Sequence, residues 1–246
     1  HAGDTLQGAL QWTKRQNLME QWLFIGPDNR QEQVNLPHTW NAKDGQDGGN
    51  DYYRGTCHYE KTFEKPEFDP EAEEVYLEFL GVNASSDVTV NGKELAHHDG
   101  GYSTFRINIT EVLEDRNKLE VTVDNSVNGK VYPQKADFTF YGGIYRDVRF
   151  LIVSKEHFDL DYLGSNGIKI TPEVKENEAN VHIETFTNTE EAQVNVQIKD
   201  QDGKVVAEGN GCDVNLNIQN PIRWHGRKNP YLYTAASQQP QVICCH

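Results

Sequence analysis

The feature that most constrains the fold of this chain is a series of short segments in which apolar and polar residues alternate, each bounded by Gly, Asn, Asp or Pro. The clearest are residues 75–80, 87–90, 119–123 and 146–153. Alternation with a period of two is typical of a strand with one buried face, and the bounding residues favour turns. Almost no long segment has the 3.6-residue period of a helix, and residues 110–113 are expected to form a single helical turn. The sequence therefore predicts an all-β fold.

The character of the sequence changes near residue 154, which predicts two domains. Before this point aromatic residues, glycines and prolines are dense, and an Asn-Gly pair after residue 90 predicts a hairpin. After it, evenly spaced polar strands such as 179–186 suggest an immunoglobulin-like sandwich. We therefore assign residues 1–154 to a first sandwich domain and residues 155–246 to a second.

The C-terminal end of the second domain is unusual. Residues 235–240 are polar and show no strand pattern. An immunoglobulin-like sandwich of about 100 residues that starts near residue 156 needs another strand or two. We therefore expect this domain to be clipped, or its last strand to be replaced by an unrelated tail.

Composition and length exclude several classes of protein. A formal net charge of −15 argues against nucleic acid as a partner, because a phosphate backbone needs a basic surface. Apolar runs reach only four or five residues, whereas a membrane-spanning helix needs about 20, so no membrane span is expected. The four cysteines have no C-x-x-C spacing, which favours unpaired cysteines over a zinc or redox site. A (β/α)8 barrel takes about 250 residues by itself, so an enzyme that needs a barrel and accessory domains is not complete in this chain.

Three stretches, residues 36–55, 97–105 and 136–148, are rich in aromatic, amide and acidic side chains. Sugars suit such surfaces, because their C–H faces lie on aromatic rings and their hydroxyls bind carboxylates and amides. The alternative is structural: glycine pairs make tight turns, aromatic residues pack in the core or at its edge, and charged residues pair with neighbours. This alternative applies to Trp40, Tyr53, Tyr102, Tyr145, Arg54, Arg146 and Asp147.

The residues themselves indicate neither a metal site nor a catalytic site, and no cofactor is expected. Residues 44–51 resemble a calcium loop, but they lack the twelfth-position Glu and the flanking helices of an EF-hand. Residues 97–99 could begin a metal site, but no second cluster has ligand spacing, so a solvated loop is expected. Glycoside hydrolysis needs two carboxylates at a set separation. The acidic pairs at 73–74 and 190–191 sit beside turns and are expected to be solvated surface.

Taken in chain order, these stretches resemble glycoside hydrolase family 2, most closely its bacterial β-galactosidase branch. The resemblance runs from about residue 12 to residue 234, and β-glucuronidases and β-mannosidases share most of it. The residues that carry it are 34–40 (VNLPHTW), 52–55 (YYRG), 77–82 (LEFLGV), 90–92 (VNG), 98–103 (HDGGYS), 137–138 (DF), 141–148 (YGGIYRDV) and 224–233 (WHGRKNPYLY).

The resemblance implies a galactose-binding-like jelly-roll sandwich, then an immunoglobulin-like sandwich, then a (β/α)8 barrel that holds an acid/base Glu and a nucleophilic Glu. No position of this chain matches the barrel motifs, so no catalytic residue is assigned and the isolated chain is expected to be inactive. By resemblance, Asp137 binds hydroxyls of the terminal sugar. The loop that contains Asn50 and Asp51 approaches the same site. The tail after Thr234 departs from the family, which is consistent with truncation or a frameshift.

The sequence therefore predicts the N-terminal part of a retaining family 2 enzyme that acts on β-galactosides, with a carbohydrate and the catalytic barrel as partners. Three alternatives stay open: a stand-alone carbohydrate-binding module, a β-glucuronidase-like or β-mannosidase-like member of the same family, and a purely structural or interaction role that includes a homo-oligomer. We expect a bacterial protein, periplasmic or secreted rather than cytoplasmic.

Overall fold

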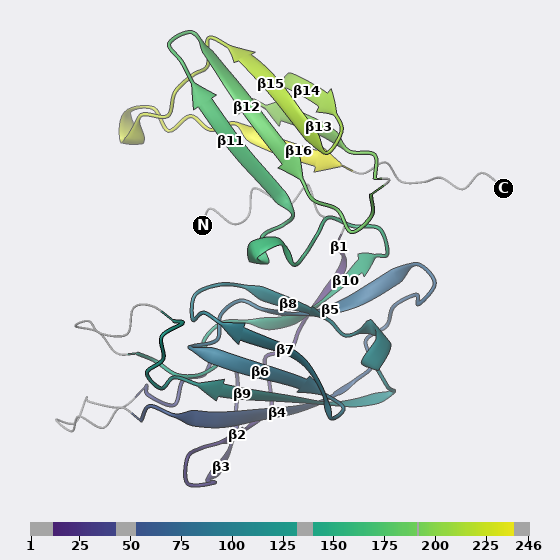
Figure 1. Cartoon of the computed structure of the whole chain (residues 1–246), viewed down its shortest axis with the longest axis vertical. Coiled ribbons are helices and arrows are strands. Elements are labelled where there is room, and N and C mark those ends of the chain that lie inside the picture. Colours follow the sequence, from purple (N-terminus) through teal and green to yellow (C-terminus); the bar gives the residue numbers. More distant parts are fainter. Residues whose placement is uncertain (1–11, 43–52, 132–139, 191, 239–246) are drawn as a thin grey trace. The chain divides into compact units, whose positions relative to one another are not determined.

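The computed structural model describes residues 12–42, 53–131, 140–190 and 192–238, and divides the chain into two compact units (Figure 1). One unit comprises Trp12–Val153, and the other includes the described residues from Ser154 onward. In these ranges helix is limited to three short 3₁₀ turns, so the predicted all-β fold is confirmed. No helix in the described part of the chain has the length and apolar character needed to cross a membrane.

The first unit contains two sheets. The four-stranded sheet has the order β1-β10-β5-β8, and the six-stranded sheet has the order β3-β2-β4-β9-β6-β7. The strand bounds are β1 Trp12–Asn17, β2 Trp22–Ile25, β3 Gln31–Val34, β4 Thr56–Glu64, β5 Glu73–Phe79, β6 Ser85–Val90, β7 Lys93–Asp99, β8 Phe105–Asn108, β9 Arg116–Asp124 and β10 Val148–Ser154.

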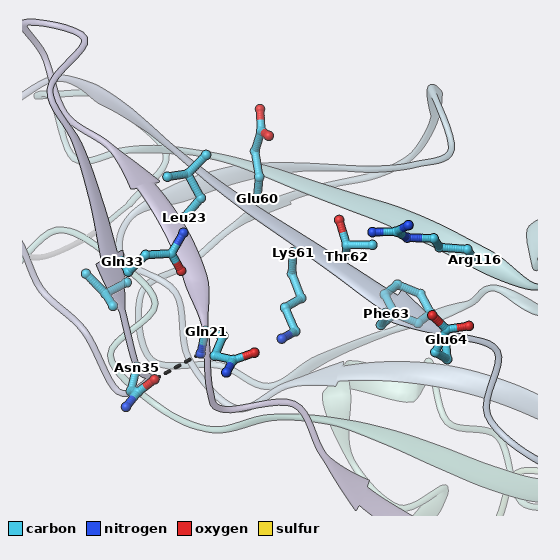
Figure 2. Close-up of a pocket in the computed structure, with 11 residues that line it drawn as sticks. Gln21, Leu23, Gln33, Asn35, Glu60, Lys61, Thr62, Phe63, Glu64 and Arg116 are labelled. Atoms are coloured by element: carbon cyan, nitrogen blue, oxygen red, sulfur yellow. Dashed lines mark hydrogen bonds between the residues drawn. The ribbon is translucent and has the colours of Figure 1, made fainter.

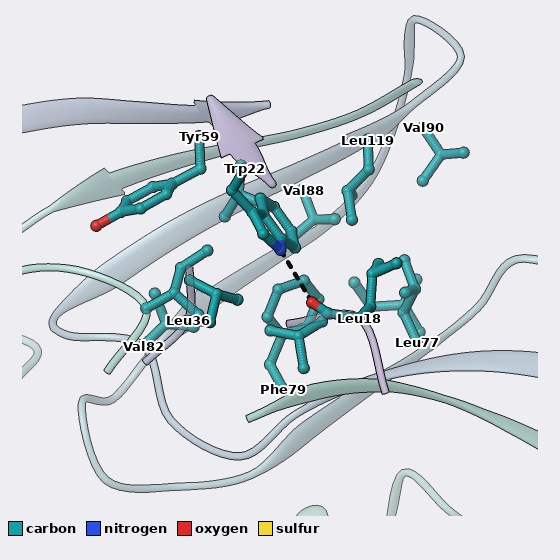
Figure 3. Close-up of a cluster of buried hydrophobic side chains, with 14 of the residues drawn as sticks. Leu18, Trp22, Leu36, Tyr59, Leu77, Phe79, Val82, Val88, Val90 and Leu119 are labelled. Carbon is teal, nitrogen blue, oxygen red and sulfur yellow. Dashed lines mark hydrogen bonds between the residues drawn. The ribbon is translucent and has the colours of Figure 1, made fainter. Parts of the chain in front are cut away.

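The core of the first unit lies between these two sheets (Figure 3). Trp22 and Tyr59 come from the six-stranded sheet, and Leu77 and Phe79 come from the four-stranded sheet. The indole N–H of Trp22 donates to the Leu18 carbonyl at 2.9 Å, which satisfies the polar atom of a buried ring. Along β6 and β9 buried residues alternate with more exposed ones, as the period of two predicts.

The predicted hairpin and the predicted helical turn are both present, and they contact each other. Asn91 and Gly92, with φ values of 51° and 78°, join β6 to β7. A pair of positive φ angles suits a two-residue hairpin because it matches the twist of the strands. The Asn91 amide donates to the Val112 carbonyl at 2.8 Å, at the end of the 3₁₀ turn η1 (Thr110–Val112).

A buried ion pair crosses the four-stranded sheet. Glu78 of β5 is 1% exposed, and its carboxylate accepts hydrogen bonds from the Nε atoms of Arg106 on β8 at 2.6 Å and Arg149 on β10 at 2.5 Å. Each oxygen binds one guanidinium, so neither side of the carboxylate is left without a partner.

The second unit also contains two sheets, β11-β12-β15 and β14-β13-β16. The expectation that residues 235–240 show no strand is corrected for residues 235–238. They belong to β16, which pairs antiparallel with β13, and Ser237 in it is buried. The small or polar residues of β16 have no alternating apolar pattern, so the sequence did not predict this strand. Its pairing with β13 forms it. The bounds are β11 Ile168–Val174, β12 Glu178–Thr185, β13 Asn195–Lys199, β14 Val205–Asn210, β15 Asp213–Gln219 and β16 Thr234–Gln238, with 3₁₀ turns η2 Tyr162–Gly164 and η3 Gly226–Lys228.

Two cysteines lie in the described ranges, and both are free thiols. Cys57 on β4 is buried, and burial raises the pKa of its thiol to about 12. At pH 8 about one such thiol in 10⁴ is ionised, and the thiolate is the nucleophile. We therefore predict that iodoacetamide modifies native Cys57 at least about 100-fold more slowly than in guanidinium, measured by peptide mass spectrometry. Half-buried Cys212 is the internal comparison, and fast native labelling of Cys57 would contradict the prediction.

Candidate functional site

The three sugar-contacting residues inferred from the resemblance, Asn50, Asp51 and Asp137, lie outside the described residues. The structure instead describes the chain on either side of the two segments, 43–52 and 132–139, that contain them. These flanking residues converge on one group of buried polar contacts in the first unit.

Asn125, which follows β9 and is 1% exposed, is the centre of this group. Its side-chain oxygen accepts from the Gly55 N–H at 2.9 Å. Its amide N–H group donates to the Phe140 carbonyl at 3.1 Å and lies 3.5 Å from the Tyr53 carbonyl. Tyr53 directly follows the first segment and Phe140 directly follows the second, so one side chain joins the ends of both.

A second buried amide, Asn41, completes the arrangement just before the first segment. Its N–H group donates to the Tyr53 carbonyl at 3.0 Å, and its oxygen accepts from the Gly142 N–H at 2.8 Å. The two amides also contact each other, with Asn125 Nδ2 3.4 Å from Asn41 Oδ1. We call the six residues that make these contacts the loop-root network: Asn41, Tyr53, Gly55, Asn125, Phe140 and Gly142.

The glycine pair 142–143 is required by close approach, as the structural alternative predicted. A Cβ atom on Gly142 would lie 2.1 Å from the Trp40 ring and 2.7 Å from Asn125 Nδ2. Gly143 has φ = 131°, and a Cβ atom there would lie 2.6 Å from the His38 carbonyl. Real Cβ atoms do not approach other atoms so closely, so larger residues would displace the network.

Aromatic residues support the network from the core side. The His38 ring and the Tyr59 hydroxyl share a hydrogen bond of 2.8 Å, and burial lowers the pKa of His38. The imidazole is therefore neutral at pH 7. Trp40 stacks on Phe24 with ring centroids 6.0 Å apart, and its indole N–H donates to the Tyr53 carbonyl at 3.2 Å.

The charged and aromatic residues singled out in the sequence have mainly structural roles. Arg54 donates to the Asn125 carbonyl at 3.0 Å and lies over the Phe140 ring at 5.0 Å. Arg146 donates to the carbonyls of Leu80 and Tyr102 at 3.3 and 3.2 Å.

Not every aromatic residue in these stretches packs in the core. The Tyr145 hydroxyl donates to the Gly101 carbonyl, which agrees with a packing role. Tyr102, however, is 59% exposed, so the packing interpretation is wrong for this residue. Its backbone is held by Arg146 while its ring is left accessible.

The sequence did not identify Asn125 as a site residue, because it predicted only that this residue closes the strand at 119–123. The available signal was weak: an Asn directly after an alternating strand is usually a turn residue. Its role depends on Gly55 and Asn41, which lie 70 and 84 positions away in the chain.

The stretch at 97–99 is the end of strand β7 and not the solvated loop that the sequence predicted, and its side chains form an ion-pair cluster. His97 lies between Asp87 at 2.6 Å and Asp99 at 3.1 Å, and Asp99 also contacts Lys130 at 3.0 Å. The Ser85 hydroxyl, together with Lys130 and His97, lowers the pKa of Asp99 to about 2. Among the residues that the structure describes, no group of side chains has metal-binding geometry, so hydrogen bonding accounts for this cluster.

We predict that His97 and His98 titrate on opposite sides of pH 6.5. Hydrogen bonds to Asp87 and Asp99 raise the pKa of His97, whereas burial lowers that of His98. Two-dimensional NMR of the ring nitrogens against pH measures both in one sample. Asp87→Asn is expected to lower the His97 midpoint and to change the His98 midpoint much less, since Asp87 acts on His98 only through the charge of His97.

The same pKa shifts determine how the ion-pair cluster changes the free energy of unfolding with pH. The raised His97 pKa contributes stability that is complete below about pH 6.5 and is lost as the pH rises through the folded value. The lowered Asp99 pKa contributes stability above about pH 4 that is lost as the pH falls toward 2. If the imidazoles of His97 and His98 titrated at the same pH, the opposite pKa shifts of the two residues would be contradicted.

A polar groove of about 880 Å³ is a separate feature of the first unit (Figure 2). It opens beside β4, because β2 pairs with β4 only as far as Leu23↔Glu60 while β4 continues along β9. Lys61 donates to the Glu20 carbonyl at 2.8 Å, and Glu60 pairs with Lys118. The groove shares no residue with the loop-root network.

Comparison with known proteins relates both units to carbohydrate-active enzymes. The family model described as glycosyl hydrolase 2 galactose-binding domain-like matches residues 49–159, and the one described as glycosyl hydrolases family 2 matches residues 165–239.

Individual relatives are longer than this chain. A β-glucuronidase from Bacteroides fragilis is 34% identical over 219 residues, which cover 81% of this chain and 31% of that protein. A β-galactosidase from Thermoanaerobacter pseudethanolicus is 28% identical over 238 residues, which cover 90% of this chain and 31% of that protein. The crystal structure of an FMN-binding β-glucuronidase from Facaelibacterium prausnitzii L2-6 superimposes with a TM-score of 0.82 and 36% identity. The match covers 92% of this chain and 37% of that one. The chain thus spans about a third of the length of the relatives that it matches.

Proposed function

Because this chain belongs to glycoside hydrolase family 2, we propose that it is the N-terminal part of a retaining glycosidase whose two catalytic glutamates lie on a (β/α)8 barrel of the whole enzyme. Residues 1–154 form the jelly-roll domain that adds sugar contacts to the active site, and residues 155–246 form the immunoglobulin-like domain. In a retaining enzyme one carboxylate forms a covalent glycosyl intermediate and the other acts first as acid and then as base.

The loop-root network is the observation that carries this proposal. Asp51 is two positions from Tyr53, and Asp137 is three positions from Phe140. A chain spans at most about 3.5 Å per residue, so the Cα atoms of the two aspartates lie within about 7 and 10 Å of the Cα atoms of Tyr53 and Phe140. Asn125 contacts the carbonyls of both Tyr53 and Phe140. One buried side chain thus holds the residues that directly follow both polar segments.

In this proposal Asp137, Asn50 and Asp51 bind hydroxyls of the non-reducing-end sugar. Their role is to position the substrate, since a correctly held sugar lowers the entropy cost of the reaction without any proton transfer from these groups. The hydrogen-bonded network matters because a hydroxyl contact is useful only if its carboxylate is held in place.

We propose β-galactosides as the substrates, because carboxylate and amide contacts suit a neutral sugar. β-Glucuronides are the second candidate, favoured by the names of two of the relatives described above. The ratio of kcat/KM for the two 4-nitrophenyl glycosides, measured on the whole enzyme, separates them.

We predict that this chain alone hydrolyses neither 4-nitrophenyl β-galactoside nor the β-glucuronide. In the whole enzyme, Asp137→Ala is expected to lower kcat/KM by about 100-fold, as misplacement of a substrate does. Exposed Asp115→Ala is the matched control and should leave kcat/KM unchanged. Turnover by the purified chain would overturn the proposal. Galactoside binding by the isolated chain that Asp137→Ala abolishes would instead favour a stand-alone binding module.

A further inference from the structure

The polar groove of the first unit lies where two neighbouring strands separate (Figure 2). β2 stays beside β4 only as far as the Leu23↔Glu60 pair, whereas residues 61–64 of β4 continue along β9. Directly before β2 the chain bends at Gln21, where φ is 56°. The groove has a volume of about 880 Å³, and clefts that hold small ligands typically have about 300–1,000 Å³. Its size therefore suits a bound molecule.

One cation, Lys61, reaches this groove from the inner face of β4. The neighbouring alternate positions of the strand, Cys57, Tyr59 and Phe63, are all buried, whereas Lys61 is half-buried. Its ammonium donates one hydrogen bond to the Glu20 carbonyl at 2.8 Å, and Lys61 forms no other hydrogen bond or ion pair with the described residues. An ammonium group has three N–H donors. Two donors and a positive charge are therefore available to a ligand.

Three amide side chains line the groove on the side towards which Lys61 extends: Gln21, Gln33 and Asn35 (Figure 2). The Gln21 backbone N–H donates to the side-chain oxygen of Asn35 at 2.9 Å, which orients this amide and leaves its NH₂ group for another partner. An amide group both donates and accepts hydrogen bonds, as the binding of sugar hydroxyls requires. Leu23, which pairs with Gln33 across β3, adds an apolar surface for the C–H face of a sugar ring.

The other charged groups of the groove are balanced by their neighbours. Glu60 pairs with Lys118 at 3.2 Å, and Glu64 stands opposite Arg116 in the β4–β9 register. Lys61 therefore supplies the unbalanced charge of this groove, on a chain whose formal net charge is −15. Hydrogen bonds between an ammonium and a carboxylate are stronger than those between neutral groups. A ligand with carboxylates as well as hydroxyls fits these groups better than a neutral one.

The unpaired side of residues 61–64 raises the alternative of an added β-strand, since an edge strand presents free N–H and C=O groups. Proteins oppose such pairing with lysines and with charged side chains that point inward at the edge. Lys61 is a lysine at such an inward position. A sugar needs no main-chain pairing and uses the side-chain groups that line the groove, so these groups favour a sugar over a peptide strand.

We propose that this groove is a second carbohydrate site, which binds an oligosaccharide that contains uronic acid. The ammonium of Lys61 binds a uronate carboxylate, and the amides of Asn35, Gln21 and Gln33 bind ring hydroxyls. The site shares no residue with the loop-root network. It therefore does not depend on the sugar contacts proposed for Asp137.

An NMR titration of the full chain tests this site. The probe is a trimer of galacturonic acid, and the neutral comparison is the galactose trimer with the same linkage. The side-chain amide signals of Gln21, Gln33 and Asn35 are followed. They are expected to shift with the acidic trimer at a Kd of about 1 mM or tighter, and at least about tenfold more weakly with the neutral trimer. Asp137→Ala should leave the Kd of the acidic trimer unchanged.

Two substitutions and a matched control assign the binding to the groove. Lys61→Met keeps the length of the side chain but removes the charge, so the Kd should rise at least about tenfold. Exposed Gln33→Ala, which leaves Lys61 in place, should raise it at least about threefold. Lys93→Met removes an exposed lysine of β7 and should change nothing. Unchanged emission of buried Trp22 verifies that each variant is folded.

Three results would overturn the proposal. Equal affinity for the acidic and the neutral trimer would remove the role of the carboxylate. Equal weakening by Lys93→Met and Lys61→Met would mean that the trimer is attracted by charge without a site. Shifts of the three amides with the peptide Val-Thr-Val-Thr-Val and with neither sugar would show that the groove accepts a strand.

Discussion

Replacing Glu78 by alanine is expected to lower the free energy of unfolding of the first unit by about 3–5 kcal/mol. Glu78 is 1% exposed and accepts hydrogen bonds from both Arg106 and Arg149. Without the carboxylate, two guanidinium groups stay close together with their shared counter-charge removed, and the Arg106 side chain is itself only 5% exposed. The cost is large because the Arg106 charge is desolvated, whereas the Arg149 side chain is 22% exposed and can still reach water. This loss is a substantial part of the free energy of unfolding of a domain, which is typically about 5–15 kcal/mol.

Urea titration followed by the fluorescence of buried Trp22 measures this loss. The Trp224→Phe background removes the exposed tryptophan of the second unit, so the signal follows the first unit more closely. Glu78→Gln keeps the shape and one of the two acceptor oxygens but loses the charge, so its cost should be intermediate. Glu71→Ala, at an exposed position, should change stability by less than about 0.5 kcal/mol. A loss below about 1 kcal/mol for Glu78→Ala would contradict the buried ion pair.

Strands with a regular apolar face could be predicted from the sequence. Residues 87–90, 119–123 and 179–186 all correspond to strands, because alternate side chains enter a core and the pattern is local. The edge strand β16 could not be predicted. Its residues are small or polar, and its structure depends on pairing with β13, about 40 positions earlier in the chain.

The need for contacts between residues far apart in the sequence limited the prediction of the site more than it limited the prediction of the fold. The three dense stretches were found by their composition, and the glycine pair at 142–143 was correctly interpreted as close packing. The same composition does not distinguish exposed Tyr102 from packed Tyr145, because both are tyrosines that follow a glycine pair within two residues. Glu78 stands in an apolar strand, and only the fold brings it to arginines 28 and 71 positions away.

Asn125→Ala is expected to destabilise the first unit by about 2–4 kcal/mol, because it removes the buried side chain that accepts from the Gly55 N–H and donates to the Phe140 carbonyl. Asn125→Asp is the sharper variant. Its carboxylate still accepts from Gly55, but it has no N–H for Phe140, and it places a charge beside the Tyr53 carbonyl. It should therefore be destabilised more strongly above the pKa of the new carboxyl than below it. Exposed Gln31→Ala is the control and should be neutral.

The effect on the whole enzyme should exceed the effect on stability. If the loop-root network holds both sugar-contacting segments, Asn125→Ala loosens the ends of both, and misplacement of a contact by about 1 Å is enough to cost about 100-fold in rate. Well below the melting temperature, kcat/KM should then fall by at least about tenfold with the first unit still folded. Asp137→Ala in the Asn125→Ala background should cost less than it does alone, because the contact is already misplaced. Fully additive losses in this double-mutant cycle would mean that Asn125 supports the fold without positioning the sugar.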